Sequence, residues 1–343
     1  MRRVPEVDLL VAGAGPAGAA TAIRAALAGL SVVVVEPRPA PIDKACGEGI
    51  AHSAVSYLRR LGVELDGRPF HGIRYLDEHH AVDARFTAGP GLGVRRTTLT
   101  SALRSRLSEL DIPIIQTRVG PIIQTPTSVT AAGQTASYLA AADGLHSPIR
   151  RQLDLGDRAS TEVRRGLRQH FCVSPWTDLV EVYWSRLGEA YVTPVSDELV
   201  GVAILTSARG TFDSHLDAFP LLKRRLNGAA AAGPVLGAGP LRQRVRARTA
   251  GRVLLVGDAA GYVDALTGEG IALALRTSAE LVDCIRANRP DAYEAAWRRV
   301  SRECRLLTAS LLWARNRPLL APRIVPAAAR LPGVYRTIVN RLS

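Results

Sequence analysis

The residues best suited to chemistry begin with a glycine cluster close to the N-terminus. Residues 8–18 read Asp-Leu-Leu-Val-Ala-Gly-Ala-Gly-Pro-Ala-Gly. In such a pattern Gly13 permits a tight turn after an apolar strand, Gly15 lets the backbone approach a pyrophosphate, and Gly18 lets a helix pack closely on the sheet. The cluster therefore predicts a phosphate-binding turn.

A helix start and an acidic residue complete this pattern. Pro16 and Ala17 open an alanine-rich helix, whose free N–H groups and positive dipole end would face the phosphates. Glu36 follows the four valines at 32–35, 23 residues after Gly13, and is placed to accept hydrogen bonds from a ribose diol. Strand, turn, helix, second strand and acid stand in the required order, so we predict that the chain binds a dinucleotide.

The elements that must position these residues belong to a chain of 343 residues, of which 47% are hydrophobic. That length and composition predict a large core with two structural units, or one domain with a sizeable insertion. Apolar periodicity predicts helices over residues 51–61, 97–110, 214–226, 270–287 and 292–315. Strands are expected over residues 70–85, 113–123, 137–142, 181–184, 190–193, 199–205 and 252–256, with a loop over 228–240.

The composition argues against several classes of protein. The formal net charge is +13, but only Lys44 and Lys223 are lysines and no nucleic-acid motif is present, so we expect no nucleic acid partner. The four cysteines are far apart and no histidine lies near them at ligand spacing, which predicts neither a metal site nor disulfides and fits a reducing cytoplasm. We expect no signal peptide and no membrane-spanning helix, and hence a cytoplasmic protein.

Three later motifs add polar residues at strand ends and helix starts. Asp143-Gly144-Leu-His-Ser-Pro-Ile-Arg follows an apolar run, Gly257-Asp258 ends another, and Arg96 opens a leucine-rich helix. Ligands of open α/β sheets bind beyond the carboxyl ends of the strands, which is where Asp143 and Asp258 would lie. Taken alone, Asp258 could be a helix cap and Asp143 a turn residue.

With the N-terminal fingerprint, these motifs resemble those of FAD enzymes of the p-hydroxybenzoate hydroxylase-like superfamily. The resemblance implies that Asp258 binds a hydroxyl of the flavin's ribityl chain and that Arg96 lies near its ribityl and phosphate portion. It also implies an α/β fold, with a Rossmann-like FAD-binding domain (GR2 type), an inserted β-rich substrate domain and C-terminal helices. We expect the FAD-binding domain to comprise residues 1–68, 92–165 and 245–290, the substrate domain 69–91 and 166–244, and a C-terminal helical segment with a basic tail 291–343.

Two segments resemble the geranylgeranyl reductase-like branch of that superfamily. Lys44-Ala-Cys46-Gly47-Glu-Gly-Ile is similar to its C-G-G/E-G segment, which implies that Cys46 and Gly47 lie near the flavin's reactive face. Cys46 could equally be a small buried residue without chemistry. Thr267-Gly268-Glu269-Gly270-Ile271 also resembles this branch. Gly268, Glu269 and Gly270 open a helix whose N–H groups could meet the pyrimidine edge of a flavin.

The chain also departs from the family pattern where a substrate would bind. Ala265 replaces the usual proline, Tyr191 stands where the reductases carry tryptophan, and the tryptophan pair of flavin halogenases is absent. Catalytic residues therefore stay unassigned, with Cys46 and Tyr191 as candidates near the flavin. Each histidine is expected to be a surface or core residue, with His146 notable because it lies inside the Asp143 motif.

These resemblances imply an FAD-dependent oxidoreductase that NAD(P)H reduces and that acts on a hydrophobic small molecule (isoprenoid, quinone-like or polyketide), by hydroxylation or by C=C reduction. No second nucleotide fingerprint is present, so NAD(P)H would bind in a cleft. The rival interpretation is a flavin-holding binding or regulatory protein without turnover. The basic, apolar tail at 315–343 either packs back on the enzyme or contacts a membrane surface peripherally.

Overall fold

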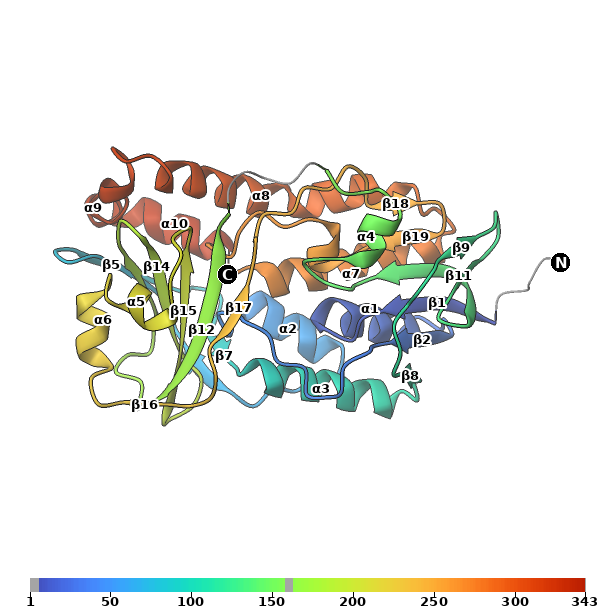
Figure 1. Cartoon of the computed structure of the whole chain (residues 1–343), viewed down its shortest axis with the longest axis horizontal. Coiled ribbons are helices and arrows are strands. Elements are labelled where there is room, and N and C mark those ends of the chain that lie inside the picture. The colour runs from blue at the N-terminus through green and yellow to red at the C-terminus, as the bar shows by residue number, and fades with distance from the viewer. Residues whose placement is uncertain (1–5, 158–162, 343) are drawn as a thin grey trace.

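A mainly parallel sheet forms one half of the molecule (Figure 1). The structure is a computed structural model that describes residues 6–157 and 163–342. Its parallel strands lie in the order β19, β11, β1, β2, β8, and β9, β10 and β18 extend the sheet in antiparallel fashion. The bounds are β1 Val7–Ala12, β2 Val32–Val35, β8 Ile114–Ile115, β9 Ile123–Gln124, β10 Val129–Ala131, β11 Gln134–Ala141, β18 Thr249–Ala250 and β19 Val253–Leu255.

Helices cover this sheet because its central strands are apolar on both faces. Residues of β1, β2 and β11 are almost all buried, as is typical of parallel strands between helical layers. The small side chains of α1 let it pack against both α3 and α7. On α3 the leucines 99, 103 and 107 form the buried stripe that their spacing predicts. The helices are α1 Pro16–Leu27, α2 His52–Arg60, α3 Arg96–Glu109 and α7 Gly270–Arg286.

A second, mainly antiparallel sheet forms the other half of the molecule (Figure 1). Its order is β16, β12, β15, β14, β13, β5, β6, with β17 also paired to β12. Strands β5 and β6, from the early part of the chain, join it because β5 pairs in parallel with β13. The bounds are β5 Gly72–Leu76, β6 Ala81–Arg85, β12 Arg165–Cys172, β13 Val180–Trp184, β14 Gly188–Pro194, β15 Leu199–Thr206, β16 Ala230–Ala231 and β17 Leu236–Ala238.

A third, small sheet consists of three short strands within residues 49–93. Strand β7 Gly91–Gly93 pairs with β3 Gly49–Ile50 on one side and with β4 Arg68–Phe70 on the other. A Cβ at Gly93 would lie 1.7 Å from the carbonyl oxygen of Pro194, so this sheet packs directly against strand β14. The segment around residue 49 is thereby fixed against the second sheet.

Three predicted elements differ in the structure. The helix expected over 214–226 is two short helices, α5 Phe212–Leu216 and α6 Pro220–Arg225. Pro220 has no N–H to continue the first helix and instead begins the second. The loop expected over 228–240 contains β16 and β17, and the strand expected over 113–123 is extended only at its two ends, in β8 and β9.

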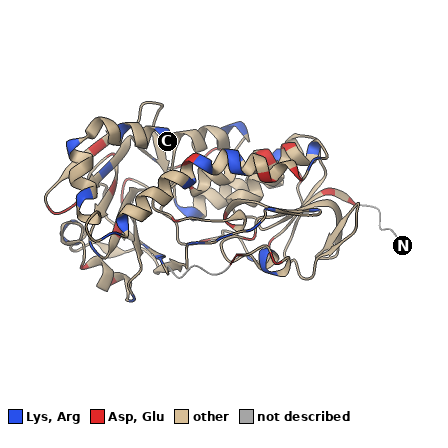
Figure 2. Cartoon of the chain, turned by 90° about the horizontal axis from the view of Figure 1, so that it is seen from above, with Lys and Arg blue, Asp and Glu red and all other residues tan. Residues whose placement is uncertain are grey.

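The C-terminal helices lie along the molecule and then over the second sheet (Figure 1). Helix α8, Ala292–Arg315, has the bounds that the sequence predicts. After the short turn η2 (Ala321–Arg323), α9 Ile324–Arg330 and α10 Pro332–Leu342 follow. Tyr335 and Val339 of α10 are buried against β6, so one face of the tail packs on the protein. Basic residues recur along these helices (Figure 2).

Candidate active site

Two glycines shape the turn after β1. Gly13 has a φ of +105°, and a Cβ there would lie 2.5 Å from the carbonyl oxygen of Ala142. A Cβ at Gly18 would lie 1.8 Å from the carbonyl oxygen of Gly13. Gly15 is the N-cap of α1 and provides no capping side chain, and Pro16 is at the start of the helix. The first N–H groups of α1 therefore face the cavity described below without a side-chain partner.

Glu36 directly follows β2 and its carboxylate is almost wholly buried. Its Oε2 accepts a hydrogen bond from the N–H of Ala14 at 2.9 Å, and its Oε1 accepts from Arg38 Nε at 2.8 Å. Burial opposes ionisation, but the hydrogen bonds from Arg38 and Ala14 outweigh it and hold the pKa of Glu36 below its usual range. Glu36 is thus an ionised acceptor next to the glycine turn.

Asp143 and Gly144 follow β11 at the same edge of the sheet. Asp143 Oδ2 accepts from the N–H of Ile149 at 3.0 Å, while its buried Oδ1 has no partner among the described residues. Ser147 caps the short helix α4, Pro148–Gln152. Burial raises the pKa of Asp143 above its ordinary value. Asp143 therefore has a turn role, and its second oxygen is buried without a partner at the cavity wall.

Asp258 lies in the 3-10 turn η1, Gly257–Ala260, directly after the buried strand β19. A Cβ at Gly257 would lie 2.6 Å from that of Ala17, so this turn touches the start of α1. Burial raises the pKa of Asp258, and the nearby Arg96 and Lys44 oppose the shift. The structure thus brings the carboxylate expected near a ribityl chain beside two cations.

Arg96 begins α3 and lies between the glycine turn and Cys46. A Cβ on Gly15 would be 3.9 Å from Arg96 Nη2, and Arg96 Nη1 is 4.0 Å from Cys46 Sγ. The buried Nε of Arg96 has no partner in the described part of the chain. Burial, followed by Arg38 and Arg96, lowers the pKa of Lys44, whose Nζ lies 3.0 Å from where a Cβ of Gly144 would be.

Cys46 is half-buried in a segment that hydrogen-bonds to the second sheet and to the start of α3. The hydroxyl of Thr193 on β14 donates to the carbonyl oxygen of Gly47 at 2.7 Å. The N–H of Glu48 donates to Cys46 Sγ at 3.4 Å. Cys46 and Gly47 both line the cavity. They line it together with residues of the nucleotide fingerprint and of the second sheet, and their position beside a flavin stays a prediction.

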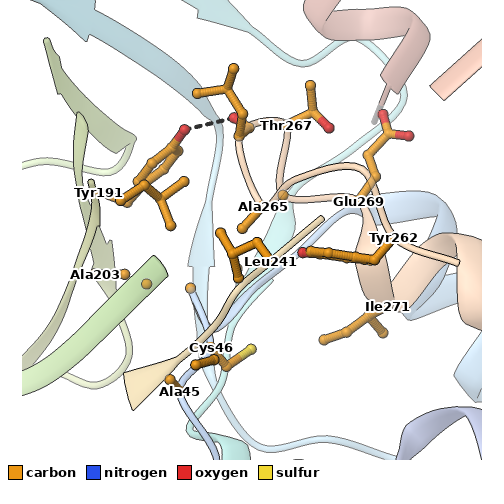
Figure 3. A pocket seen from close by; sticks show the side chains of 18 of the residues that line it. Ala45, Cys46, Tyr191, Ala203, Leu241, Tyr262, Ala265, Thr267, Glu269 and Ile271 are labelled. Carbon is orange, nitrogen blue, oxygen red and sulfur yellow. Dashed lines mark hydrogen bonds between the residues drawn. The ribbon is translucent and has the colours of Figure 1, made fainter. Parts of the chain in front are cut away.

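Tyr191 stands opposite Tyr262 across the cavity, and Cys46 lies away from both (Figure 3). The Tyr191 hydroxyl donates to the carbonyl oxygen of Leu266 at 2.7 Å. Burial, with a further contribution from Glu189, raises its pKa well above the ordinary value. Tyr191 therefore anchors the loop before α7 and keeps its proton.

The segment Thr267–Gly270 forms the turn into α7. Gly268 has a φ of +72°, and Glu269 is the N-cap residue without a side-chain cap bond. In Figure 3 the Glu269 carboxyl points away from Cys46 and Tyr262. Burial raises its pKa to about 7, and one of its oxygens has no partner among the described residues. Gly268, Glu269 and Gly270 all line the cavity.

One cavity of about 1390 Å³ connects these segments, except that Glu36 is not among its lining residues and pairs with Arg38, which is. That volume exceeds the roughly 300–1,000 Å³ of pockets that hold one small molecule. Its polar end is lined by the glycine turn, Arg96 and Asp258. The other end is apolar and reaches the partly exposed side chains of α10; its lining includes Ile73, Tyr75, Val182, Leu311, Leu331 and Val334. The cavity can hold a dinucleotide and an apolar ligand together.

Sequence reasoning missed a buried chain of side chains beside Cys46. His170 on β12 is 1% exposed and its Nε2 lies 2.6 Å from Glu48 Oε2. Arg168, two residues earlier on the same face of the strand, lies 3.0 Å from His170 Nδ1. The two-residue spacing was a readable signal, but the pairing with Glu48, 122 residues away, was not.

His146, in contrast, is an exposed residue at the cavity wall.

No helix in residues 6–157 and 163–342 is both long and apolar enough to cross a membrane. Within the same residues, no group of His, Cys, Asp and Glu side chains could hold a metal ion.

A dinucleotide fingerprint at the edge of a parallel sheet, with a cavity that continues into a second sheet, defines a nucleotide-binding flavoprotein. Comparison with known families agrees. The chain belongs to the FAD binding domain family, whose model matches residues 6–310. It is therefore an FAD-dependent oxidoreductase, and the α/β flavoprotein fold predicted from the sequence is confirmed.

Two curated relatives are reductases. A menaquinone reductase of Mycolicibacterium smegmatis is 30% identical over 328 residues, which are 84% of this chain and 79% of that protein. A digeranylgeranylglycerophospholipid reductase of Methanosphaera stadtmanae is 25% identical over 308 residues, which are 79% of this chain and 76% of that protein. The resemblance to the geranylgeranyl reductase-like branch is confirmed.

Solved structures share the fold at lower identity. The flavin-dependent brominase Bmp2 superposes with a TM-score of 0.81 and 18% identity, over 98% of this chain and 93% of that chain. The halogenase PltM in complex with phloroglucinol and FAD gives a TM-score of 0.75 and 17% identity, over 90% of this chain and 76% of that chain. These similarities concern the fold alone.

Proposed function

We propose that this protein is an NAD(P)H-driven, FAD-dependent reductase that saturates a C=C bond in the isoprenoid chain of a quinone or related lipid. The observation that carries the proposal is the single cavity that leads from the nucleotide fingerprint, past Cys46, to a long apolar end. The names of the two curated relatives support a reductase with an isoprenoid substrate. Hydroxylation of a hydrophobic small molecule is the alternative.

The cofactor site is proposed from the polar groups that lack partners. The free N–H groups at the start of α1 and the Arg96 guanidinium would hold the pyrophosphate, because Ala17 and Arg96 both line the cavity. Asp258 would accept a ribityl hydroxyl, and Asp143 has an oxygen free for another polar group of the cofactor. Glu36 would accept hydrogen bonds from the ribose diol, using the lone pairs of its carboxylate that Ala14 and Arg38 do not occupy. The start of α7, Gly268 to Gly270, would meet the pyrimidine edge of the flavin.

A bound FAD would supply the chemistry of hydride transfer between NAD(P)H and a carbon of the substrate. The chain's own residues exclude water and orient the substrate. Tyr191, Tyr75 and Val182 offer an apolar wall on the second sheet, and Leu311 and Leu331 close the other side. Reduction then adds one hydride and one solvent-derived proton to the double bond, while NAD(P)H becomes NAD(P)+.

The C-terminal segment suggests how a lipid reaches this cavity. Residues 304–343 contain seven arginines and no aspartate or glutamate. Trp313, Leu331 and Val334 are each more than half exposed, and the latter two line the cavity. Exposed apolar side chains among cations are typical of a surface that lies on anionic lipid. We propose that α10 and the end of α8 contact a membrane peripherally and place the cavity opening at the lipid surface.

The product's mass tests the reaction. The FAD-loaded chain would be incubated with NADPH or NADH and a menaquinone, or with a geranylgeranyl lipid, and the lipid analysed by mass spectrometry. A gain of two hydrogen atoms that persists after the quinone ring has been reoxidised is expected, because quinol formation adds the same mass but is reversed by reoxidation. A gain of one oxygen atom would instead establish hydroxylation. A flavin that no reductant and substrate pair can bleach and restore would favour the non-catalytic binding protein.

A further inference from the structure

Arg168, His170 and Glu48 form a buried polar chain that the proposed reaction does not use. Their side chains are all 3% exposed or less. Arg168 Nη1 lies 3.0 Å from His170 Nδ1, and His170 Nε2 lies 2.6 Å from Glu48 Oε2. Glu48 Oε1 accepts a hydrogen bond from the backbone N–H of Arg96 at 2.8 Å. The chain thus runs from strand β12 to the first residue of α3.

The partners fix where the protons lie in this chain. A guanidinium can only donate, so Nδ1 of His170 must accept from Arg168 and is unprotonated. The remaining ring proton is then on Nε2 and is donated to Glu48. Glu48 accepts at both oxygens, as a carboxylate does. His170 is therefore neutral, and its tautomer is set by Arg168.

The hydrogen bonds among Arg168, His170 and Glu48 hold a backbone conformation that is unfavourable by itself. Glu48 has a φ of +59°, a region that few residues other than glycine adopt. Such a conformation costs on the order of 1–3 kcal/mol and persists only where the surroundings enforce it. At Glu48 the two hydrogen bonds of the carboxylate supply that constraint.

Strand β12 also forms hydrogen bonds to the residues that precede Cys46. Arg168 Nη2 donates to the Asp43 carboxylate and to the carbonyl oxygen of Lys44. Arg168 and His170 therefore hold the segment 43–48 before and after Cys46. Thr193 adds a third attachment at Gly47. The position of the Cys46 thiol in the cavity depends on these bonds.

We propose that His170 and Glu48 are positioning residues that hold the Cys46–Gly47 backbone against the cofactor cavity and fix the start of α3 at Arg96. Neither residue exchanges a proton with substrate in this role. The proposal rests on the proposed function only for the identity of the ligand beside Cys46. The hydrogen bonds of His170 and Glu48 that hold this backbone, called the clamp below, belong to the protein itself. Their effect on Cys46 can be measured without that ligand.

The test measures how fast iodoacetamide alkylates Cys46 in the FAD-free chain, by mass spectrometry of its peptide. His170→Leu leaves one Glu48 oxygen as an unpaired buried acceptor. Because such a group costs about 1–3 kcal/mol, Cys46 alkylation should rise about fivefold or more. His170→Gln keeps a donor for Glu48 and should restore most of the protection. His215→Leu replaces another buried histidine, on α5, and should change nothing.

Internal references separate a loosened segment from a loosened protein. The exposed Cys172, at the end of β12, should react at an unchanged rate in all variants. Half-buried Cys304, whose thiol pKa is raised by burial, should react at an unchanged slow rate, because faster reaction there would report a wider loosening of the protein. An unchanged Cys46 rate in a folded His170→Leu chain would overturn the proposal.

Glu48→Gln provides a second test that does not remove the histidine. Its Oε1 can still accept from Arg96, but its amide group then faces the Nε2 proton of His170, donor against donor. Cys46 alkylation should rise as in His170→Leu, and this variant decides the question if His170→Leu does not fold. Equal Cys46 rates in Glu48→Gln and the unaltered chain would contradict the clamp. A colourless or inactive protein would count against the proposed function and leave these rates unaffected.

Discussion

At the scale of single residues, the glycines of the nucleotide turn have different physical tasks. A Cβ at Gly18 would collide with the Gly13 carbonyl oxygen at 1.8 Å, whereas a Cβ at Gly15 would have only Arg96 Nη2 near it, at 3.9 Å. Gly18 is therefore required by the protein's own packing. Gly15 has room in the protein and is required only if a ligand approaches its backbone.

This contrast predicts different outcomes for two alanine substitutions. Gly15→Ala should leave the thermal unfolding midpoint almost unchanged and weaken FAD binding by about tenfold or more, because a methyl group displaces the pyrophosphate from the α1 N–H groups. Gly18→Ala should lower stability markedly, because α1 must move away from the turn. Unfolding scans and FAD titration of both variants test this. A Gly15→Ala chain that binds FAD with unaltered affinity would contradict the phosphate site.

Glu269 provides a pH-dependent prediction at the same scale. Its pKa is raised to about 7 by burial, so the folded state holds a proton that the unfolded chain has lost above pH 4.5. Stability should therefore decrease as pH rises from about 4.5 to 7, by on the order of 3 kcal/mol at most. Glu269→Gln should remove that part of the slope and be the more stable form at pH 8. Urea unfolding at pH 5.5 and pH 8 measures it, and parallel slopes for the two proteins would refute it.

At the scale of elements, a buried ion cluster joins the second sheet to the loop before α7. Arg164 lies 2.7 Å from Glu189 Oε2 on β14 and 2.9 Å from Asp264 Oδ2. Arg315, at the end of α8, also pairs with Glu189. Asp264 is two residues before Leu266, whose carbonyl oxygen accepts a hydrogen bond from the Tyr191 hydroxyl. The cluster therefore fixes one wall of the cavity.

Arg164→Ala should destabilise the chain by about 3–5 kcal/mol, because it leaves buried carboxylates without their cation. Protonation relieves an unpaired carboxylate, so the loss should be smaller at pH 5 than at pH 8. Arg315→Ala removes the outer partner and should cost less. Denaturant unfolding of the three proteins at both pH values is the measurement. A larger loss for Arg315→Ala than for Arg164→Ala would show that the cluster is held from outside.

Several elements could be predicted from local patterns, and others could not. Helix α8 and the strand, turn and helix of the fingerprint follow from apolar spacing and glycine placement, which are local. The single helix expected over 214–226 is wrong, because Pro220 interrupts it even though the apolar periodicity continues. The limits of the domains stay a prediction. The Glu48–His170 pair arises only when β12 packs on the loop at 43–48, and no local pattern encodes that contact.

At the scale of the whole molecule, the tail has two faces. Tyr335 and Val339 pack on the second sheet, while Leu331, Val334 and Ile338 stay exposed at the cavity. The sequence offered packing on the enzyme and contact with a membrane as alternatives. One face of α10 packs on the protein, and we propose that the other, exposed face contacts a membrane.

This division predicts binding to anionic lipid vesicles. The chain should sediment with phosphatidylglycerol vesicles, less with phosphatidylcholine and less at high salt, because its arginines provide part of the attraction. Leu331→Ser combined with Val334→Ser should reduce binding about tenfold or more, through lost apolar contact. Ile123→Ser, equally exposed but on β9 of the other sheet, is the matched control. Equal binding of the double variant and the control would contradict a membrane-facing α10.

The central claim is that one FAD lies in the cavity between the glycine turn and the start of α7. Its most direct measurement is the visible absorbance and bound FAD content of the purified chain after incubation with excess FAD and removal of the free cofactor. The account predicts a yellow protein with one FAD per chain, and strongly reduced retention in Gly15→Ala. A chain that folds, stays colourless and retains no FAD would contradict it.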